Sequence, residues 1–282
     1  MPVTLIKGLS EIEASYDALI CDVWGVLHNS REAKPQAWEA CARFHQSRPV
    51  ILFSNAPRLP VEVQKQLTKL GVPSSCYDAI VTSGAVTHDA LKRRTEHHRL
   101  KLFHLGPERD HSVYEGLNVE IVPAEEAELI LCTGLYDDET ETAENYRPLF
   151  QKLLPKKLTM LCVNPDIVVM RGERLIYCAG ALARAYEEMG GQVLYYGKPH
   201  LPIYHAVMEC AHRFGIAARP LVVGDGLETD IKGANAAGID ALFIMDGIFS
   251  NDIASKSNPA SVERLLNDKD VGARYAMTAL AW

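Results

Sequence analysis

The stretch ALICDVWGVL, residues 18–27, places an acidic side chain directly after an apolar run of strand length. We interpret Ala18–Cys21 as a buried strand, and Gly25 relaxes the turn that follows Asp22. Open parallel sheets bind their ligands at the carboxyl ends of strands. We therefore expect the Asp22 carboxylate at the mouth of such a sheet. There it can act as a nucleophile, although a lone aspartate at a strand end can equally cap a turn.

Short apolar runs alternate with helix-length amphipathic segments along the chain, which is the pattern of βα units around a largely parallel sheet. The sequence predicts strands at residues 18–21, 50–53, 79–82, 101–105, 129–132, 159–163, 221–223 and 241–244. It predicts helices at residues 35–46, 60–70, 84–95, 142–152, 178–189, 201–214 and 230–237. The expected fold class is α/β with a parallel sheet.

The length of 282 residues favours two domains or one large domain. Polar motifs at strand ends occur before residue 83 and after residue 190, and the long stretch between them carries strands of its own. We therefore expect a core domain formed by residues 1–83 and 190–282, with an inserted α/β domain at residues 84–189.

Composition limits the classes of function. A net charge of −7 without a long basic run argues against a nucleic-acid surface, because phosphate backbones require a basic patch. The seven cysteines show neither a C-x-x-C pair nor dense spacing, so we expect reduced thiols that are mostly buried. The chain shows no apolar leader and no run of eighteen apolar residues, and we expect a cytoplasmic protein that does not enter a membrane.

Three further polar motifs follow apolar runs: Ser54-Asn55, Gly197-Lys198-Pro199, and Gly224-Asp225-Gly226 continuing to Asp230. A hydroxyl and backbone N–H groups ahead of a helix, as at Ser54 and Asn55, suit a phosphate oxygen. Lys198 carries a donor on a long stem that can hold a phosphate and the Asp22 carboxylate together. Most lysines, however, simply lie at the surface.

Asp225 and Asp230 supply two carboxylates at another strand end. Carboxylates packed near Asp22 repel one another unless a cation joins them. Mg²⁺ is the expected cofactor, because it binds one or two carboxylates, keeps waters and takes its remaining oxygens from phosphate. Alternatively, Asp225 starts a turn and Asp230 caps a helix. A dinucleotide fingerprint starting at Gly224 is disfavoured, since position 229 is Thr rather than Gly.

The ordered motifs D-x-x-G-x-L at Asp22, S-N at Ser54, G-K-P at Gly197 and G-D-x-x-x-x-D at Gly224 resemble those of the haloacid dehalogenase (HAD) superfamily. The resemblance is specifically to its class IIA, NagD-like phosphatases, and spans nearly the whole chain. It includes Val163-Asn164-Pro165-Asp166, which is similar to the Asn-Pro-Asp of the class IIA cap, and the small pair Gly180-Ala181. It implies a Rossmann-like core with an inserted α/β cap, which in this class often mediates a homodimer.

By this resemblance, Asp22 would be the nucleophile, and Ser54 and Asn55 would contact the phosphate. Lys198 would be both a catalytic lysine and a phosphate contact. Such enzymes form an aspartyl-phosphate, release the alcohol and then hydrolyse the intermediate with water. The implied function is Mg²⁺-dependent hydrolysis of a small phosphorylated metabolite, of the sugar phosphate or nucleotide type.

The resemblance also implies a metal site and a substrate-facing cap. Asp22, the backbone carbonyl of Trp24, Asp225 and Asp230 would hold Mg²⁺, the last two directly or through water. The cap would close over the substrate and exclude water from the reaction. Asn164 and Asp166 would face the substrate, or they would simply close a tight turn.

Position 24 departs from the pattern, because phosphatases of this family carry a second aspartate there as general acid and base. An indole has one N–H donor and no titratable proton near neutral pH, and losing proton transfer costs roughly 10² to 10⁴ in rate. Three readings follow. The chain is a phosphatase with an activated leaving group or another acid such as His28, or a dehalogenase-like enzyme. Alternatively, it is a phosphate-binding or regulatory protein with little or no catalysis. Lys198, Asp225 and Asp230 favour phosphate and metal over a haloacid.

Overall fold

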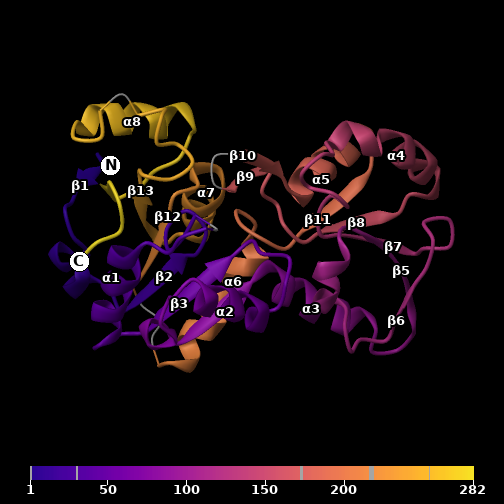
Figure 1. Cartoon of the computed structure of the whole chain (residues 1–282), viewed down its shortest axis with the longest axis horizontal. Coiled ribbons are helices and arrows are strands. Elements are labelled where there is room, and N and C mark those ends of the chain that lie inside the picture. The colour runs from indigo at the N-terminus through magenta and orange to yellow at the C-terminus, as the bar shows by residue number, and fades with distance from the viewer. Residues whose placement is uncertain (1, 30, 172–173, 216–218, 254) are drawn as a thin grey trace.

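The chain forms two lobes that lie side by side, and both termini belong to the same lobe (Figure 1). The computed structural model describes residues 2–29, 31–171, 174–215, 219–253 and 255–282. The first lobe is built from the two ends of the chain and the second from its middle, as the colours from indigo to yellow show. Among the described helices, none has both the length and the apolar composition to cross a membrane.

A seven-stranded sheet forms the centre of the first lobe, and all its strand pairings are parallel. In spatial order its strands are β1 (Thr4–Leu5), β14 (Tyr275–Met277), β13 (Asp240–Ile244), β12 (Pro220–Gly224), β2 (Ala18–Asp22), β3 (Val50–Ser54) and β4 (Ala79–Thr82). From β2 the chain adds β3 and β4 on one side, and after the second lobe it adds β12 to β14 on the other. Open parallel sheets bind ligands where the strand order reverses in this way.

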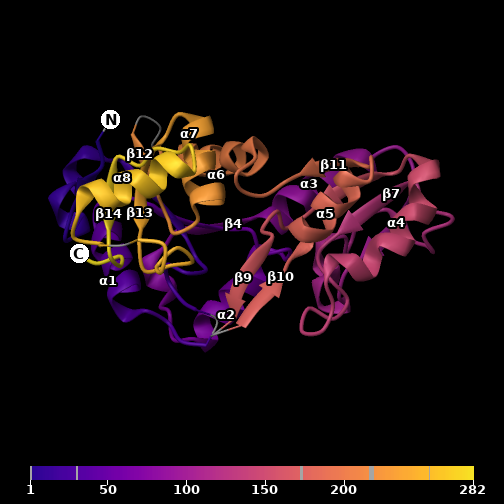
Figure 2. The ribbon, with the colours of Figure 1, turned by 90° about the horizontal axis from the view of Figure 1, so that it is seen from above.

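The second lobe contains another parallel sheet and a separate hairpin. The five strands of this sheet, in spatial order, are β11 (Gln192–Tyr195), β8 (Thr159–Cys162), β7 (Leu129–Cys132), β5 (Leu100–Leu105) and β6 (Val119–Ile121). The antiparallel β9–β10 hairpin, formed by β9 (Val168–Arg171) and β10 (Arg174–Tyr177), lies between the lobes in Figure 2. It is therefore the part of the second lobe that is placed to meet the first.

Helices cover the faces of both sheets. The α-helices are α1 (Pro35–His45), α2 (Pro60–Lys69), α3 (Ser83–Arg94), α4 (Arg147–Leu153), α5 (Ala179–Glu188), α6 (Leu201–Arg213), α7 (Lys232–Ala237) and α8 (Pro259–Asp268). Short 3₁₀ helices lie at Leu9–Glu11, Glu13–Ser15, Ser74–Cys76, Glu108–Val113, Ala143–Tyr146 and Leu154–Lys156, and a π-turn lies at Leu227–Ile231. Helices α1, α2, α4, α6 and α8 carry proline in the first turn, where its missing N–H costs no hydrogen bond.

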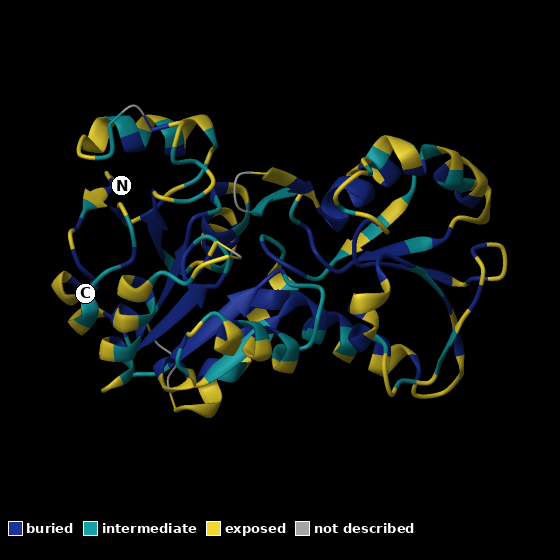
Figure 3. Cartoon of the chain, viewed as in Figure 1, coloured by how far each residue is buried: buried dark blue, intermediate teal, exposed yellow. Residues whose placement is uncertain are grey.

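The seven-stranded sheet is buried on both faces (Figure 3). Leu19 and Cys21 of β2 belong to one apolar cluster and Ile20 to the other, as the alternation of a strand requires. Burying an aliphatic side chain of this size contributes about 1.5–3 kcal/mol. The polar residues at the strand ends therefore stand on a tightly packed support.

The structure confirms the α/β fold class and the predicted elements, most of which differ from their predicted bounds by one residue at either end. Two predicted helices differ more: the one at 142–152 is divided between Ala143–Tyr146 and α4, and the one at 230–237 begins with the π-turn at residue 227. All seven cysteines are free thiols and six are buried, as expected.

The sequence missed helix α8 and the strands β1, β6, β9, β10, β11 and β14. These strands are only two to four residues long. A strand this short carries too little pattern to recognise without its pairing partner. Strand β11 also corrects the predicted boundary at residue 190, because it pairs with β8 in the second lobe. The return to the core therefore follows Tyr195, and the division into residues 1–83 with 190–282 and 84–189 otherwise stays a proposal.

Gly180, in the first turn of α5, supports the loop that carries Asp166. Its backbone N–H donates to the Asp166 carbonyl at 3.1 Å. A Cβ at this position would lie 2.1 Å from the Pro165 carbonyl oxygen and 2.5 Å from that of Asp166. Helix α5 can approach the loop this closely only because residue 180 has no side chain.

We predict that Gly180→Ala destabilises the protein, although alanine is the better helix former. The clash is with backbone oxygens, so it should cost about 3 kcal/mol, the upper end for overpacking, and outweigh the gain of about 1 kcal/mol in helix propensity. Thermal unfolding measures the effect. The control is Gly272→Ala, since a Cβ there meets nothing closer than 4.0 Å. Equal melting temperatures for the two variants would contradict the proposed close contact.

Candidate functional site

Three neighbouring strands of the seven-stranded sheet lead into polar residues at one edge. Strand β2 ends at Asp22, β3 ends at Ser54, and β12 is followed by Asp225. Because β2 pairs in parallel with both β3 and β12, these three ends lie side by side. They form the floor of a cavity of about 340 Å³ that residues 168–170 of β9 also line. The strand ends of the first lobe and strand β9 of the hairpin thus line the same cavity.

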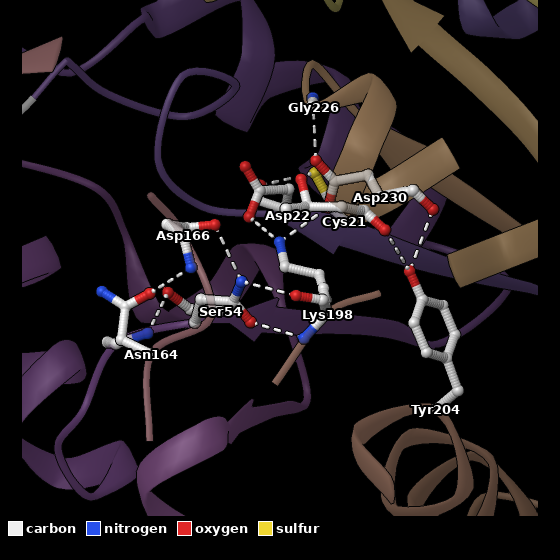
Figure 4. Close-up of polar contacts among 12 residues, drawn as sticks. Cys21, Asp22, Ser54, Asn164, Asp166, Lys198, Tyr204, Gly226 and Asp230 are labelled. Carbon is white, nitrogen blue, oxygen red and sulfur yellow. Dashed lines mark hydrogen bonds and ion pairs between the residues drawn. The ribbon is translucent and has the colours of Figure 1, made fainter. Parts of the chain in front are cut away.

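Lys198 joins the end of β2 to the π-turn that follows β12 (Figure 4). Its Nζ donates to Asp22 at 2.5 Å and to Asp230 at 2.6 Å. The lysine side chain is only 3% exposed, and Nζ lies 4.3 Å from the centre of the Phe53 ring. Lys198 follows the segment of chain that returns from the second lobe, so residues from three distant parts of the sequence meet at this ammonium group.

Burial and charge oppose each other in this cluster. Burial raises the pKa of Asp22 well above its usual value, against the effect of Lys198. Burial also raises the pKa of Asp225 to about 7, and the charge of Asp230 adds to the rise. Although burial lowers the pKa of Lys198, the carboxylates of Asp22 and Asp230 outweigh it and hold that pKa well above its usual value. The site therefore holds more carboxyl groups than Lys198 alone can balance.

Two glycines let Asp225 approach the backbone. Gly25 has a φ of 85°, and a Cβ there would lie 2.2 Å from Asp225 Oδ2. A Cβ on Gly247 would lie 2.0 Å from the same oxygen. The backbone N–H of Ile248 donates to this oxygen at 3.0 Å. The turn after Asp22 and the loop at residues 246–248 therefore close tightly around Asp225.

Asp230 is turned inward by the π-turn at Leu227–Ile231. Its Oδ2 accepts a hydrogen bond from the Gly226 N–H at 3.0 Å, and the Tyr204 hydroxyl of α6 donates to its backbone oxygen at 2.9 Å. Segments of π-helix frequently occur at functional sites. The side chain is 2% exposed and bonded to Lys198, so Asp230 does more than cap a helix.

Ser54 and Asn55 both line the cavity, but their side chains are engaged differently. Ser54 Oγ accepts from the Ala56 N–H at 3.2 Å, and its own hydroxyl proton can still be donated. Asn55 Oδ1 accepts from the Lys198 N–H at 2.7 Å, while Nδ2 donates to the Lys198 carbonyl at 3.1 Å and to Asp166 at 2.9 Å. Asn55 therefore holds the Lys198 backbone in place, and the expected phosphate contact at this position stays a prediction.

Asn164 and Asp166 have separate positions. Asn164 Oδ1 accepts from the Asp166 N–H at 3.0 Å, which closes a tight turn, and Asn164 lines a neighbouring cavity. Asp166 lines the cavity of Asp22 and accepts the hydrogen bond from Asn55. Burial raises the pKa of Asp166 to about 6. Of the two expected cap residues, Asp166 is the one that the structure brings to the strand ends.

Trp24 and His28 pack against each other beside the cavity. The Trp24 Nε1 donates to the Met170 carbonyl in β9 at 3.0 Å, and the His28 ring lies edge-on with the ring centres 5.3 Å apart. His28 is 2% exposed, and burial lowers its pKa to about 4, with Lys34 contributing. It lines the neighbouring cavity with Asn164. A neutral imidazole in that position is a poor replacement for the missing acid.

Sequence reasoning missed Lys34, which lines the cavity of Asp22. Its Nζ donates to the carbonyl oxygen of Gly25 and, at 3.3 Å, to that of Asp246. Burial lowers the pKa of Lys34, against the charge of Asp225. Lys34 belongs to no motif, and the only signal in the sequence was a lysine immediately before Pro35, where a helix was expected to start.

The three carboxylates form a set that fits a hard divalent cation. One oxygen from each of Asp22, Asp225 and Asp230 lies within 4.8 Å of the others, and all three residues are buried. Carboxylate oxygens are the ligands that Mg²⁺ prefers, and a cation would relieve the repulsion that raises the pKa of Asp225. These residues fit the Mg²⁺ site expected from the sequence. The carbonyl of Trp24 as a further ligand stays a prediction.

Two family models match the parts of the chain that carry these residues. The family described as haloacid dehalogenase-like hydrolase matches residues 19–120, and a HAD-hydrolase-like family matches residues 195–268. The chain is also similar to a solved hydrolase of the haloacid dehalogenase-like family from Brucella suis 1330. The two are 41% identical with a TM-score of 0.86, over 98% of this chain and 100% of the other.

Two more distant matches, a sequence and a solved structure, have names that describe an activity. D-glycerol 3-phosphate phosphatase of Mycobacterium tuberculosis is 26% identical over 259 residues, which is 86% of this chain. The matched part spans 66% of that relative's length. A solved glycerol phosphate phosphatase from Mycobacterium tuberculosis, in complex with magnesium, shares the fold. It is 20% identical with a TM-score of 0.64, over 87% of this chain and 73% of that one.

We predict that Mg²⁺ raises the melting temperature of this protein through the three carboxylates. A cation at ten times its dissociation constant should add about 1.4 kcal/mol to the free energy of unfolding, or roughly 3 °C or more. Thermal scans with and without millimolar Mg²⁺ measure the shift. Asp225→Asn should remove most of it, and the exposed Glu96→Gln should keep it. A shift of the same size in Asp225→Asn would rule out Asp225 as a ligand.

Proposed function

Because this chain belongs to the haloacid dehalogenase-like hydrolase family, we propose that it is a Mg²⁺-dependent phosphatase that acts through an aspartyl-phosphate. The observation that carries the proposal is the buried ion pair between Lys198 and Asp22, 2.5 Å long, beside the carboxylates of Asp225 and Asp230. A nucleophile, a phosphate-binding cation and metal ligands thus share one cavity. Neither a simple turn nor a surface lysine would require this arrangement.

In the first proposed step, a carboxylate oxygen of Asp22 bonds to phosphorus while the bond to the ester oxygen breaks. The ester oxygen leaves with the electron pair and takes a proton from solvent or an acid. Lys198 lies against Asp22 and can hold a phosphate oxygen near the Asp22 carboxylate. The ammonium group thereby offsets the repulsion between that carboxylate and the phosphate, which are both negatively charged. The Ser54 hydroxyl offers a second donor from the adjacent strand end.

In the second proposed step, water bonds to the phosphorus of the aspartyl-phosphate and the acyl oxygen leaves as the Asp22 carboxylate. The released phosphate keeps both protons of the water. Throughout, Lys198 stays charged, because the surrounding carboxylates raise its pKa well above its usual value despite its burial. When bound to Asp22, Asp225 and Asp230, Mg²⁺ would supply positive charge for the phosphate oxygens.

We propose a small phosphorylated metabolite of the sugar phosphate or nucleotide type as the substrate. The cavity of about 340 Å³ lies within the size range of small-molecule sites. The similarity to a D-glycerol 3-phosphate phosphatase supports this substrate class. That similarity covers 66% of the relative's length.

One observation supports a second candidate function, a phosphate-binding or regulatory protein with little catalysis. The Trp24 N–H is already donated to the Met170 carbonyl, and an indole cannot protonate a leaving group. Binding without turnover would appear as phosphate affinity in calorimetry with no release of product. A dehalogenase is disfavoured, because displacement of a halide needs no divalent cation, whereas Asp22, Asp225 and Asp230 form a set that fits one.

We predict that Asp22→Asn abolishes Mg²⁺-dependent hydrolysis of 4-nitrophenyl phosphate, since an amide is not a nucleophile for phosphorus. Release of phosphate should fall to the rate without enzyme. The matched control is Asp89→Asn, an exposed residue, which should keep the wild-type rate. Turnover retained in Asp22→Asn, or absent from wild-type protein across a panel of phosphate esters, would overturn the enzymatic proposal.

We predict that an acid at position 24 favours substrates with poor leaving groups. Trp24→Asp should raise kcat/KM for alkyl phosphates over that for aryl phosphates by roughly 10² or more, because only alkoxides need a proton in the transition state. Trp24→Asn is the control, since asparagine has the same size as aspartate but no titratable proton. An equal ratio of alkyl to aryl rates in the two variants would show that proton transfer is not what position 24 lacks.

A further inference from the structure

The side chain of Trp24 connects two parts of the protein that lie far apart in the sequence. Its Nε1 donates to the Met170 carbonyl at 3.0 Å, across 146 positions. Trp24 belongs to the turn after β2, two residues beyond Asp22, and Met170 belongs to β9 in the hairpin between the lobes (Figure 2). The hydrogen bond therefore runs from the turn after the proposed nucleophile to the β9–β10 hairpin.

The β9–β10 hairpin makes few stabilising contacts with the second lobe, to which it belongs. A two-stranded hairpin is marginally stable by itself in water. All four residues of β9 are half-buried, and only Ile176 of β10 is buried. Arg171 anchors the hairpin to the second lobe with hydrogen bonds of 3.0 and 2.8 Å to Asp138. Among the hydrogen bonds of the described residues, the one from Trp24 alone ties β9 or β10 to the first lobe.

Trp24 itself is held firmly by the first lobe. The ring of the buried His28 packs edge-on against the indole at 5.3 Å. The turn is closed beneath them by a hydrogen bond of 2.8 Å from the Gly25 N–H to the His28 carbonyl. These contacts belong to the first lobe, so a hairpin that moves away from Asp22 while the indole keeps its place against His28 must break the bond to Trp24.

The position of the hairpin sets the size of the cavity, because Val168, Val169 and Met170 line it together with Asp22. We propose that Trp24 is a positioning residue whose indole N–H holds the β9–β10 hairpin closed over Asp22. An ionised aspartate at position 24 has only acceptors and cannot donate to the Met170 carbonyl. Position 24 of this chain therefore carries a permanent N–H donor to the hairpin in place of a titratable acid.

Hydrogen exchange tests the closure without any need for turnover. Trp24→Phe keeps an aromatic ring against His28 and removes the N–H together with the five-membered part of the indole. Peptides that cover β9 and β10 should exchange about two to ten times faster in this variant, the factor expected from one net hydrogen bond, while peptides of α8 stay unchanged. Trp38→Phe, the same change in α1, should leave the hairpin at its wild-type rate. Equal hairpin exchange in Trp24→Phe and wild-type protein would overturn the proposal.

A measurement on unmutated protein keeps the proposal testable if Trp24→Phe fails to fold. The chain has three tryptophans, so the Trp24 indole resonance is the one that Trp38→Phe and Trp282→Phe both retain. Its N–H should exchange with solvent at least several times more slowly than a free indole. Exchange at the free rate would show that the hydrogen bond does not persist in solution, and would overturn the closure.

The kinetic test rests on the proposed phosphatase function. Trp24→Phe should raise KM for 4-nitrophenyl phosphate about two- to tenfold with a smaller change in kcat, because fewer molecules hold the closed chamber that binds substrate. An unchanged KM would show that the hairpin does not position the substrate. If the wild-type protein has no turnover, the phosphatase proposal fails, and the exchange experiments still decide the closure.

Discussion

The rest of the site depends on the buried ion pairs that the Lys198 ammonium group forms with Asp22 and Asp230. The ammonium group lies 2.5 Å from Asp22 and 2.6 Å from Asp230, in a place where burial alone would favour the neutral forms of Lys198 and Asp22. Removing one partner of a buried pair leaves an uncompensated charge, which proteins tolerate poorly. The chain therefore has to bring Lys198 back from the second lobe to the same sheet edge that carries Asp22. The backbone of Lys198 is fixed there by the side chain of Asn55.

Small residues make room for so many carboxyl groups in one place. A Cβ at Gly25 or Gly247 would overlap Asp225, and a Cβ at Gly224 would lie 2.2 Å from the Asp230 carboxyl carbon. Backbone donors then meet the carboxyl oxygens, as Ile248 and Gly226 do for Asp225 and Asp230. These contacts fix the carboxyl groups in position before any ligand arrives. Such preorganisation is what makes fixed charges effective in catalysis.

Position 24 shows how one residue can link the chemistry of the first lobe to the position of the second. Its side chain points toward the β9–β10 hairpin and reaches the Met170 carbonyl. The sequence offered His28 as an alternative general acid. In the structure His28 is buried, its pKa is lowered to about 4, and its ring packs against the indole. The tryptophan at this position thus makes a contact between the lobes. The proposed nucleophile and the proposed closure therefore meet in the same turn.

The sequence by itself determined the strand-end motifs and the elements that carry them. Asp22, Ser54 and Asp225 could be recognised because they stand at the ends of continuous apolar runs, and a fully buried parallel strand is readable from such a run alone. Lys198 and Asp230 were recognised from the motifs G-K-P and G-D-x-x-x-x-D. The helices could be placed for a similar reason, since their periodicity is local. The metal set and the acidic cluster follow from these residues once the strands are known to be neighbours.

Only the tertiary structure decided which side chains are free to act. The side-chain amide of Asn55 is bonded to Lys198 and Asp166, which lie 143 and 111 positions away. The expected phosphate contact at Ser54 and Asn55, through a hydroxyl and backbone N–H groups, stays a prediction. The roles of Lys34 and Trp24 likewise depend on groups that are distant in sequence or presented by the backbone. Short strands such as β9 and β11 exist only through their pairing. Contacts of this kind produce no periodic pattern in the sequence, because they form between residues that are far apart along the chain.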